Sequence, residues 1–246
     1  MSADPRRISI AEPVTELKRI PIRENGEPLV DFTTLCPELR LITSRFVYRR
    51  ETVIRRSVAE MLCRANDHLL TKGFRLAIVE GWRPPFIQKR MYAAALKRWQ
   101  SRHPEWTEVK LRRVANQFTA PPSRRVPPPH TTGGAVDLFL ADRNGKPLDH
   151  VAPYKDGDPK GFYFAAPGLD GESQRARELL AEALIPTGLT NYPSEFWHWS
   201  FGDQGWAYRG GHAAALFGSI EPEGWLPDPA DVKDEPLEWR EEPNDP

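Results

Sequence analysis

Three side chains of metal-binding type stand out in the sequence: His130, Asp137 and His198. The chain has only two cysteines, Cys36 and Cys63, and neither lies near a second thiol in the sequence, so a structural zinc site built from several thiolates is excluded. Two histidines and one carboxylate leave one position of a zinc ion open for water, whose pKa then falls to about 7. We therefore predict a catalytic zinc site with hydrolytic chemistry.

Two further charged residues have positions that suit the same hydrolysis. Glu195 stands three residues before His198, directly after a Pro-Ser pair, where a carboxylate can reach a water without being a metal ligand. We predict that Glu195 takes a proton from that water and passes it to the leaving amine. Arg83 lies in the rigid corner Gly81-Trp-Arg-Pro-Pro85, so it is predicted to stabilise the negative charge of the tetrahedral intermediate.

His130 and Asp137 are seven residues apart, an odd spacing that would place them on opposite faces of one straight strand. Residues 120–130 hold five prolines, which forbid both a regular helix and a central strand, so His130 must end a loop. Gly133 and Gly134 then allow a bend before the strand that carries Asp137. The loop and the strand can therefore bring the two side chains together.

The two strands predicted to carry Asp137 and His198 each have one apolar face, because side chains alternate along a strand. Asp137 and His198 lie on the opposite faces, where a half-buried carboxylate is costly unless a cation or hydrogen-bond donors meet it. The apolar faces consist of Val136, Leu138 and Leu140 in the first strand and of Trp197, Trp199 and Phe201 in the second.

Hydrophobic periodicity predicts a fold of the α+β class. Apolar residues recur at helical spacing over residues 51–70, and Gly73 ends this helix. The same analysis gives helices over about 87–99, 108–116 and 172–184, strands over 74–79, 135–140 and 196–201, and a turn at Asn144-Gly145. We expect a single domain in which a small, mainly antiparallel sheet carries the zinc site and helices pack on its other face.

Composition excludes several classes of partner. The chain has 34 Lys and Arg against 34 Asp and Glu, so its formal net charge is zero and nothing draws the whole molecule to nucleic acid or to a membrane surface. The first residues lack the apolar stretch of a secretory signal, and no run of about 20 apolar residues is long enough to span a bilayer. We expect a cytoplasmic protein with a small polar substrate; its oligomeric state is unknown.

An acidic, proline-rich segment follows near the C-terminus. Residues 221–246 hold ten acidic residues against Lys233 and Arg240, a net charge of −8 (2 minus 10), which leaves +8 on the rest of the chain. We expect this tail to be weakly folded and solvated, with Trp225 and Trp239 as candidate anchors.

Three blocks carry a family resemblance: Gly81-Trp-Arg-Pro84, His130-Thr-Thr-Gly-Gly-Ala-Val-Asp137 and Glu195-Phe-Trp-His-Trp199. In this order they resemble the signature blocks of the VanX-type D-alanyl-D-alanine dipeptidases, zinc peptidases related to D,D-carboxypeptidases and to the hedgehog zinc domain. The resemblance implies hydrolysis of a D,D-dipeptide, D-Ala-D-Ala above all, by a zinc ion. It assigns the zinc to His130, Asp137 and His198, the general base to Glu195 and transition-state support to Arg83.

The resemblance also divides the chain and shows two departures. It runs over residues 32–218, between an N-terminal extension of residues 1–31 and the acidic tail of residues 219–246. The family has a serine that helps to hold the substrate two residues before its first zinc histidine, and this chain has Pro128 there. The family's carboxylate for the substrate amine is poorly matched, and Asp156 is the candidate.

Other interpretations stay open. A single histidine in a strand is more often hydrogen-bonded than metal-bound, and only the whole set favours a ligand role for His198. Within the enzyme class, the alternative is a D,D-carboxypeptidase or another peptidoglycan peptidase. From another class, the alternative is a non-catalytic zinc-binding interaction domain, against which Glu195 and Arg83 weigh. The remaining histidines are assigned to structure or solvent: His68, His103, His150 and His212.

Overall fold

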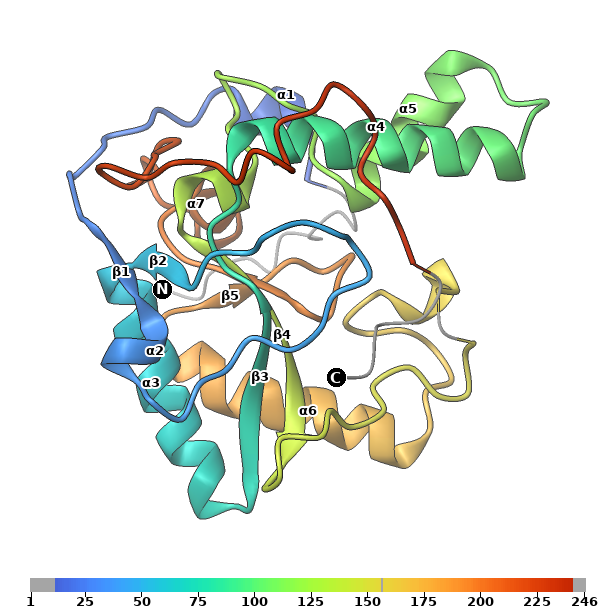
Figure 1. Cartoon of the computed structure of the whole chain (residues 1–246). Coiled ribbons are helices and arrows are strands. Elements are labelled where there is room, and N and C mark those ends of the chain that lie inside the picture. The colour runs from blue at the N-terminus through green and yellow to red at the C-terminus, as the bar shows by residue number, and fades with distance from the viewer. Residues whose placement is uncertain (1–11, 156, 241–246) are drawn as a thin grey trace.

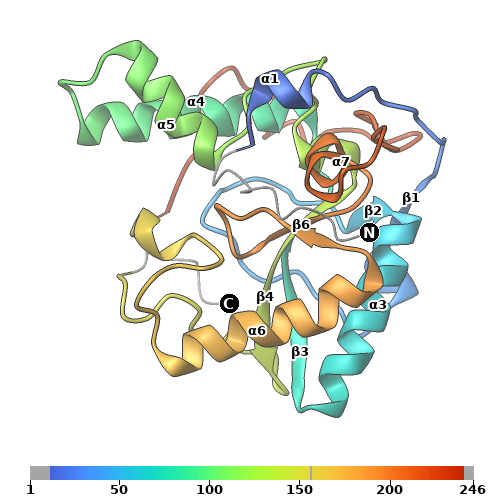
Figure 2. The same cartoon turned by 180° about the vertical axis from the view of Figure 1, so that it is seen from behind.

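The sheet that carries the predicted site has four antiparallel strands in the order β3-β4-β6-β5 (Figures 1 and 2). The computed structural model describes residues 12–155 and 157–240 of the chain. In chain order, these strands are β3 (Phe74–Glu80), β4 (Ala135–Asp142), β5 (Thr190–Asn191) and β6 (His198–Ser200). The central pair of strands places Asp137 directly opposite His198.

The other elements surround this sheet. A two-stranded antiparallel sheet is formed by β1 (Leu29–Asp31) and β2 (Val53–Arg55). The α-helices are α1 (Val14–Leu17), α2 (Phe32–Leu35), α3 (Arg56–Thr71), α4 (Pro85–Arg102), α5 (Glu108–Phe118), α6 (Gly171–Leu184) and α7 (Gln204–Gly210). The described residues also form three short 3-10 helices, η1 (Pro129–Thr132), η2 (Pro159–Gly161) and η3 (Ile185–Thr187).

Helices α3 and α6 cover one face of the sheet and bury its aliphatic side chains (Figure 2). Val136, Leu138 and Leu140 of β4 are fully buried there, together with Trp199 of β6. Burial of such side chains is the main force that holds strands and helices together, at about 25 cal/mol per Å² of apolar surface. The predicted α+β class and the predicted apolar face of β4 are confirmed, and the metal-type side chains are left on the opposite face. Of the apolar face predicted for the second strand, only Trp199 lies within β6.

Two predicted elements begin later in the structure than predicted. The helix predicted over residues 51–70 begins only at Arg56, because residues 53–55 pair with β1 as an antiparallel strand. The strand predicted over 196–201 is regular only over His198–Ser200, because the backbone NH of His198 donates to the Glu195 carbonyl (3.1 Å) and closes a turn. In both places, tertiary pairing and local hydrogen bonding decide where the element begins.

The acidic segment near the C-terminus packs on the body of the protein as far as Arg240, which corrects the expectation that it is solvated. It runs along α4 in Figure 1. Leu237 is buried against Ile87 and Met91 of that helix, and the ring of Trp239 contacts Phe46 edge-on at 4.8 Å. Its few apolar side chains thus anchor it. The predicted division of the chain at residues 31 and 218 stays a prediction.

None of the helices described within residues 12–155 and 157–240 combines the length and the apolar character needed to cross a membrane.

Candidate metal centre

The structure brings His130, Asp137 and His198 together although three separate segments supply them. Asp137 Oδ1 lies 2.9 Å from His198 Nδ1 and 3.2 Å from His130 Nε2, and the two imidazole nitrogens are 3.2 Å apart. Both histidines are buried, and Asp137 is half-buried. Three potential ligand atoms therefore converge on one point.

This donor set fits a zinc ion. Zinc binds imidazole nitrogen and carboxylate oxygen at about 2.0–2.2 Å, so the ligand atoms of a tetrahedral site are about 3.3 Å apart. His130 Nδ1 donates to the Gly81 carbonyl (2.8 Å), which leaves the lone pair of Nε2 facing an Asp137 oxygen. Two lone pairs at this distance repel each other unless a cation or a second proton lies between them. The arrangement of acceptors is that of a cation site.

Local backbone geometry delivers His130 and Asp137 to this point as the glycines predict. His130 lies in η1, at the end of the proline-rich loop, and Gly133 follows with a left-handed φ of 70°. Gly134 packs so closely on β6 that a Cβ there would lie 2.5 Å from the Phe201 carbonyl oxygen. The bend therefore requires glycine at both positions.

The electrostatic environment keeps Asp137 ionised. Burial alone would raise the pKa of its carboxyl, but the imidazoles of His130 and His198 outweigh burial and hold the pKa well below its usual range. Its second oxygen, Oδ2, lies 4.0 Å from an Arg83 guanidinium nitrogen. An ionised carboxylate is the form that binds a metal.

Arg83 is buried beside the three convergent residues and is held in one orientation. Its Nε donates to Glu80 Oε1 (2.7 Å), its Nη2 pairs with the other Glu80 oxygen, and its Nη1 donates to Gln88 Oε1 (2.6 Å). Burial lowers the pKa of Arg83, but the charges of Glu80 and Asp137 outweigh it and keep the pKa above its ordinary value. The arginine thus presents a fixed positive charge next to Asp137.

Glu195 is buried, with 8% of its surface exposed, and approaches the same region from the turn before β6. Burial raises the pKa of its carboxyl well above the usual value, the charge of Asp137 adds to this, and Arg83 opposes it. A general base works best when its pKa lies near the working pH, which is the direction of this shift. The structure thus places all five predicted residues in one neighbourhood.

Several residues that support the site were not predicted from the sequence. Glu80 and Gln88 orient Arg83, as described above. Asn191 Nδ2 donates to the carbonyls of Glu195 (3.0 Å), Phe196 (3.2 Å) and His198 (3.0 Å) and so fixes the turn that carries Glu195. The only local signal was for Glu80, a carboxylate directly after the apolar run of residues 76–79, since such a group is rarely buried without a partner.

The remaining histidines lie outside the metal centre. His150 is buried, accepts from the Leu140 NH (3.1 Å) and donates to the Leu148 carbonyl (2.8 Å); burial lowers its pKa to about 4, so it is neutral and structural. His103 and His212 stack on Trp106 and Trp206, and His68 is exposed. Asp156, the candidate for the substrate amine, lies outside the described residues.

The two cysteines, which are far apart in the sequence, are neighbours in the structure. Cys36 is buried at the end of α2, and Cys63 of α3 packs against the same core. Burial, followed by a hydrogen bond with Cys36, raises the pKa of the Cys63 thiol to about 12. The Cys63 thiol therefore stays protonated and offers no thiolate to a metal.

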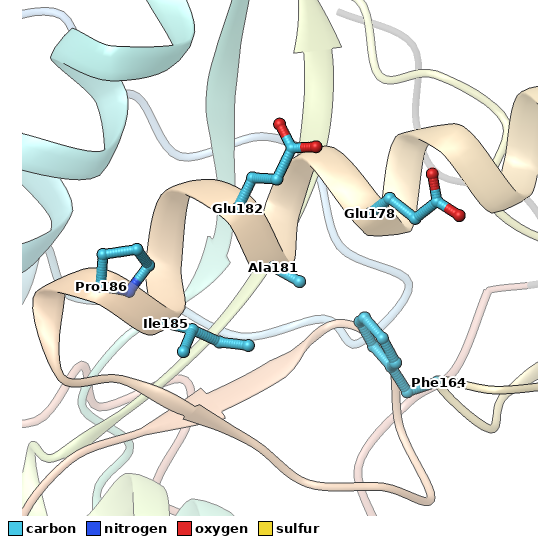
Figure 3. Close-up of a pocket in the computed structure, with 6 residues that line it drawn as sticks. All are labelled: Phe164, Glu178, Ala181, Glu182, Ile185 and Pro186. Atoms are coloured by element: carbon cyan, nitrogen blue, oxygen red, sulfur yellow. The ribbon is translucent and has the colours of Figure 1, made fainter.

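A shallow apolar hollow lies on the helix face beside α6, where it contains none of the predicted site residues (Figure 3). Ala181, Ile185 and Phe164 point into it, whereas the carboxylates of Glu178 and Glu182 turn away, and Glu182 pairs with Lys72 at 2.6 Å. The two carboxylates are the only titratable groups of its lining, and neither is directed into the hollow.

Replacing Gly81 with alanine is expected to destabilise the protein by about 1–3 kcal/mol, because overpacking a core has this cost. A Cβ at this position would lie 2.6 Å from Ile54 Cγ2 and 3.0 Å from the Val53 carbonyl oxygen. The backbone must shift, and with it the carbonyl that orients His130. Denaturant unfolding measures the loss. Gly171→Ala is the control, because a Cβ there meets no atom within 4 Å, and equal unfolding curves for the two variants would contradict the prediction.

Comparison with known proteins relates the chain to one family. The model of peptidase family M15, described as D-ala-D-ala dipeptidase, matches residues 41–214. A D-alanyl-D-alanine dipeptidase of Synechocystis sp. is 28% identical over 229 residues, which cover 82% of this chain and 93% of that protein. One of Escherichia coli K12 is 23% identical over 180 residues, 69% of this chain and 82% of that protein.

Among solved structures, VanYB in complex with D-alanine-D-alanine is 15% identical, with a TM-score of 0.44, over 80% of this chain and 93% of that chain. The five residues of the candidate centre all lie within the range matched by the family model.

Proposed function

The chain belongs to the D-Ala-D-Ala dipeptidase family of metallopeptidases, and we propose that it hydrolyses D,D-dipeptides, D-Ala-D-Ala first among them, with a zinc ion held by His130, Asp137 and His198. The observation that carries this assignment is the convergence of the three side chains, whose candidate ligand atoms all lie within 4.8 Å of one another. A bound zinc ion supplies a Lewis acid that polarises the scissile carbonyl and acidifies water.

The residues around the zinc ligands provide the remaining chemistry. In the proposed reaction, the Glu195 carboxylate takes a proton from water while the water oxygen bonds to the scissile carbonyl carbon. Negative charge then develops on the former carbonyl oxygen, and the fixed guanidinium of Arg83 stabilises it. Glu195 finally gives the proton to the amide nitrogen as the C–N bond breaks, so that two free amino acids leave.

The nature of the relatives supports a dipeptide as substrate. Both proteins reported above are D-alanyl-D-alanine dipeptidases, and the alignment with the first covers 93% of its length. We also propose the cytoplasmic location that the sequence predicts. Cell fractionation, with the protein detected by an antibody, tests this location.

The proposed function is tested by amine release from a panel of peptides. Zinc-loaded protein is given D-Ala-D-Ala, L-Ala-L-Ala and a wall pentapeptide that ends in D-Ala-D-Ala. We expect turnover of D-Ala-D-Ala alone. Cleavage of only the pentapeptide would identify a D,D-carboxypeptidase, and no turnover by zinc-loaded protein would favour a non-catalytic zinc-binding domain.

Replacing Arg83 with lysine is expected to lower kcat for D-Ala-D-Ala by about 10²- to 10³-fold, the effect of losing one transition-state donor. Lysine keeps the charge but cannot pair with both Glu80 oxygens and with Gln88 in one planar geometry. Steady-state kinetics gives the value. Arg112→Lys on the exposed side of α5 serves as the matched control, and a similar kcat for both variants would remove Arg83 from the mechanism.

A further inference from the structure

The backbone of Ile220 connects the two loops that carry His130 and Arg83. Its NH donates to the carbonyl of Thr131 (3.0 Å), the residue after His130, and its carbonyl accepts from Trp82 Nε1 (2.7 Å), the residue before Arg83. We propose that residues 219–240, here called the C-terminal strap, position these two loops and so set the metal affinity and the turnover of the site. The proposal rests on the proposed function of that site.

The near end of the strap is fixed by an aromatic cluster beside the site. Trp225 contacts Trp82 edge-on at 4.9 Å and stacks near Phe86 of α4 at 6.3 Å. Its Nε1 donates to Glu51 (2.9 Å). Trp82 itself is only 1% exposed, so its indole NH has no access to solvent and depends on the Ile220 carbonyl. Trp82 is therefore held by two contacts with the strap, one through its ring to Trp225 and one through its NH to the Ile220 carbonyl.

The far end of the strap is anchored independently. The NH of Leu237 donates to the Arg90 carbonyl (3.2 Å), and the Arg90 side chain donates back to the Glu235 carbonyl (2.9 Å). The NH of Arg49 donates to the Asp231 carboxylate (2.8 Å). The acidic strap thus bonds to Arg49 and Arg90 and is held at both ends, and Figure 1 shows its course along α4.

The clamped loops also contact each other directly, so a displacement of one is transmitted to the other. The backbone NH of Arg83 donates to the His130 carbonyl (3.1 Å), and the His130 ring donates to the Gly81 carbonyl (2.8 Å). Small displacements of such groups change rates strongly, because a shift of about 1 Å can cost 10²-fold. Trp82 and Ile220 are positioning residues, and the strap lies beyond the range of the family model, which ends at residue 214.

Trp82→Phe tests this inference, because it removes the indole NH and keeps an aromatic ring against Trp225. Loss of an outer-shell contact of this kind typically costs 10- to 100-fold in metal affinity or activity. We expect kcat for D-Ala-D-Ala to fall about 10-fold with little change in KM, and the zinc dissociation constant to rise about 10-fold in competition with a chelating dye. Leu179→Ala in α6, a core change remote from the strap, should lower Tm and leave both values unchanged.

For these two variants, the inference would be overturned by wild-type zinc affinity in Trp82→Phe, or by losses in Leu179→Ala equal to those in Trp82→Phe. The zinc titration needs no turnover, so it tests the strap even if D-Ala-D-Ala is not the substrate. A second variant that ends at Ser219 is expected to lose more activity and to regain part of it when a peptide of residues 220–246 is added. A truncated chain with wild-type kcat and zinc affinity would contradict the strap's role.

Discussion

Replacing Glu195 with glutamine is expected to lower kcat for D-Ala-D-Ala by about 10²- to 10⁴-fold, the range that general acid–base catalysis contributes. Glutamine has the same shape but cannot take a proton from water or return it to the leaving amine. Because Glu195 is not one of the three convergent side chains, the zinc content of the variant should equal that of the wild type. Steady-state kinetics with metal analysis of the same samples measures both quantities.

The control for this variant is Glu178→Gln on the exposed side of α6, which should keep full activity. Hydrolysis by Glu195→Gln at the wild-type rate would show that another group activates the water. A loss of zinc in parallel with the loss of activity would instead give Glu195 a role in metal binding. The proposed assignment of Glu195 as a base that is not a metal ligand would then be wrong.

Replacing His198 with alanine is expected to have an effect at least as large. A Lewis acid is worth several kcal/mol of transition-state stabilisation, and about 4 kcal/mol corresponds to about 10³-fold in rate. The variant removes Nδ1 from the group of three atoms and leaves a carboxylate and one imidazole, which hold a metal weakly. We expect stoichiometric zinc in the wild type, a small fraction of it in the variant, and turnover reduced by at least that factor.

Chelation provides an independent check on the same prediction. Removal of zinc from the wild type should abolish hydrolysis, and re-addition should restore it, whereas added zinc should not rescue His198→Ala. His68→Ala, which removes an exposed imidazole on α3, is the matched control and should keep its zinc. Wild-type zinc content in His198→Ala would place the metal elsewhere in the chain.

The buried ion pair of Glu80 and Arg83 shows how the fold and the site depend on each other. Burying both charges is costly, and removing one partner leaves an unpaired charge in a low-dielectric environment. The pair is held by two contacts between the guanidinium and the carboxylate, with a further contact to Gln88. Its position between β3 and α4 fixes the arginine relative to Asp137, which sits on the neighbouring strand.

Local patterns in the sequence are sufficient to predict much of this arrangement. Alternation along residues 135–140 separates the buried face of β4 from Asp137, and five prolines with two glycines turn His130 back toward the sheet. These features depend on short-range sterics and on burial, which a single sequence records. The predicted approach of His130 to Asp137 follows from them, whereas the addition of His198 to the set rests on the family resemblance, and the roles of all three as ligands stay predictions.

Features that depend on distant partners were not predicted. The sequence of residues 53–55 fits the first turn of a helix, but in the structure these residues pair with β1 as a strand. Glu80, Gln88 and Asn191 bond residues only three to seven positions away, but the folded backbone decides which of these side chains meet. The acidic tail has the composition of a solvated segment, yet Trp225 packs on Trp82, Leu237 on α4 and Trp239 on Phe46.

Anomalous X-ray scattering at the zinc absorption edge, from crystals of the protein purified with zinc, tests the central claim most directly. We expect a single strong peak about 2.0–2.2 Å from His130 Nε2, Asp137 Oδ1 and His198 Nδ1. If the zinc peak lies at another position and none lies between these three atoms, the proposed zinc site is wrong.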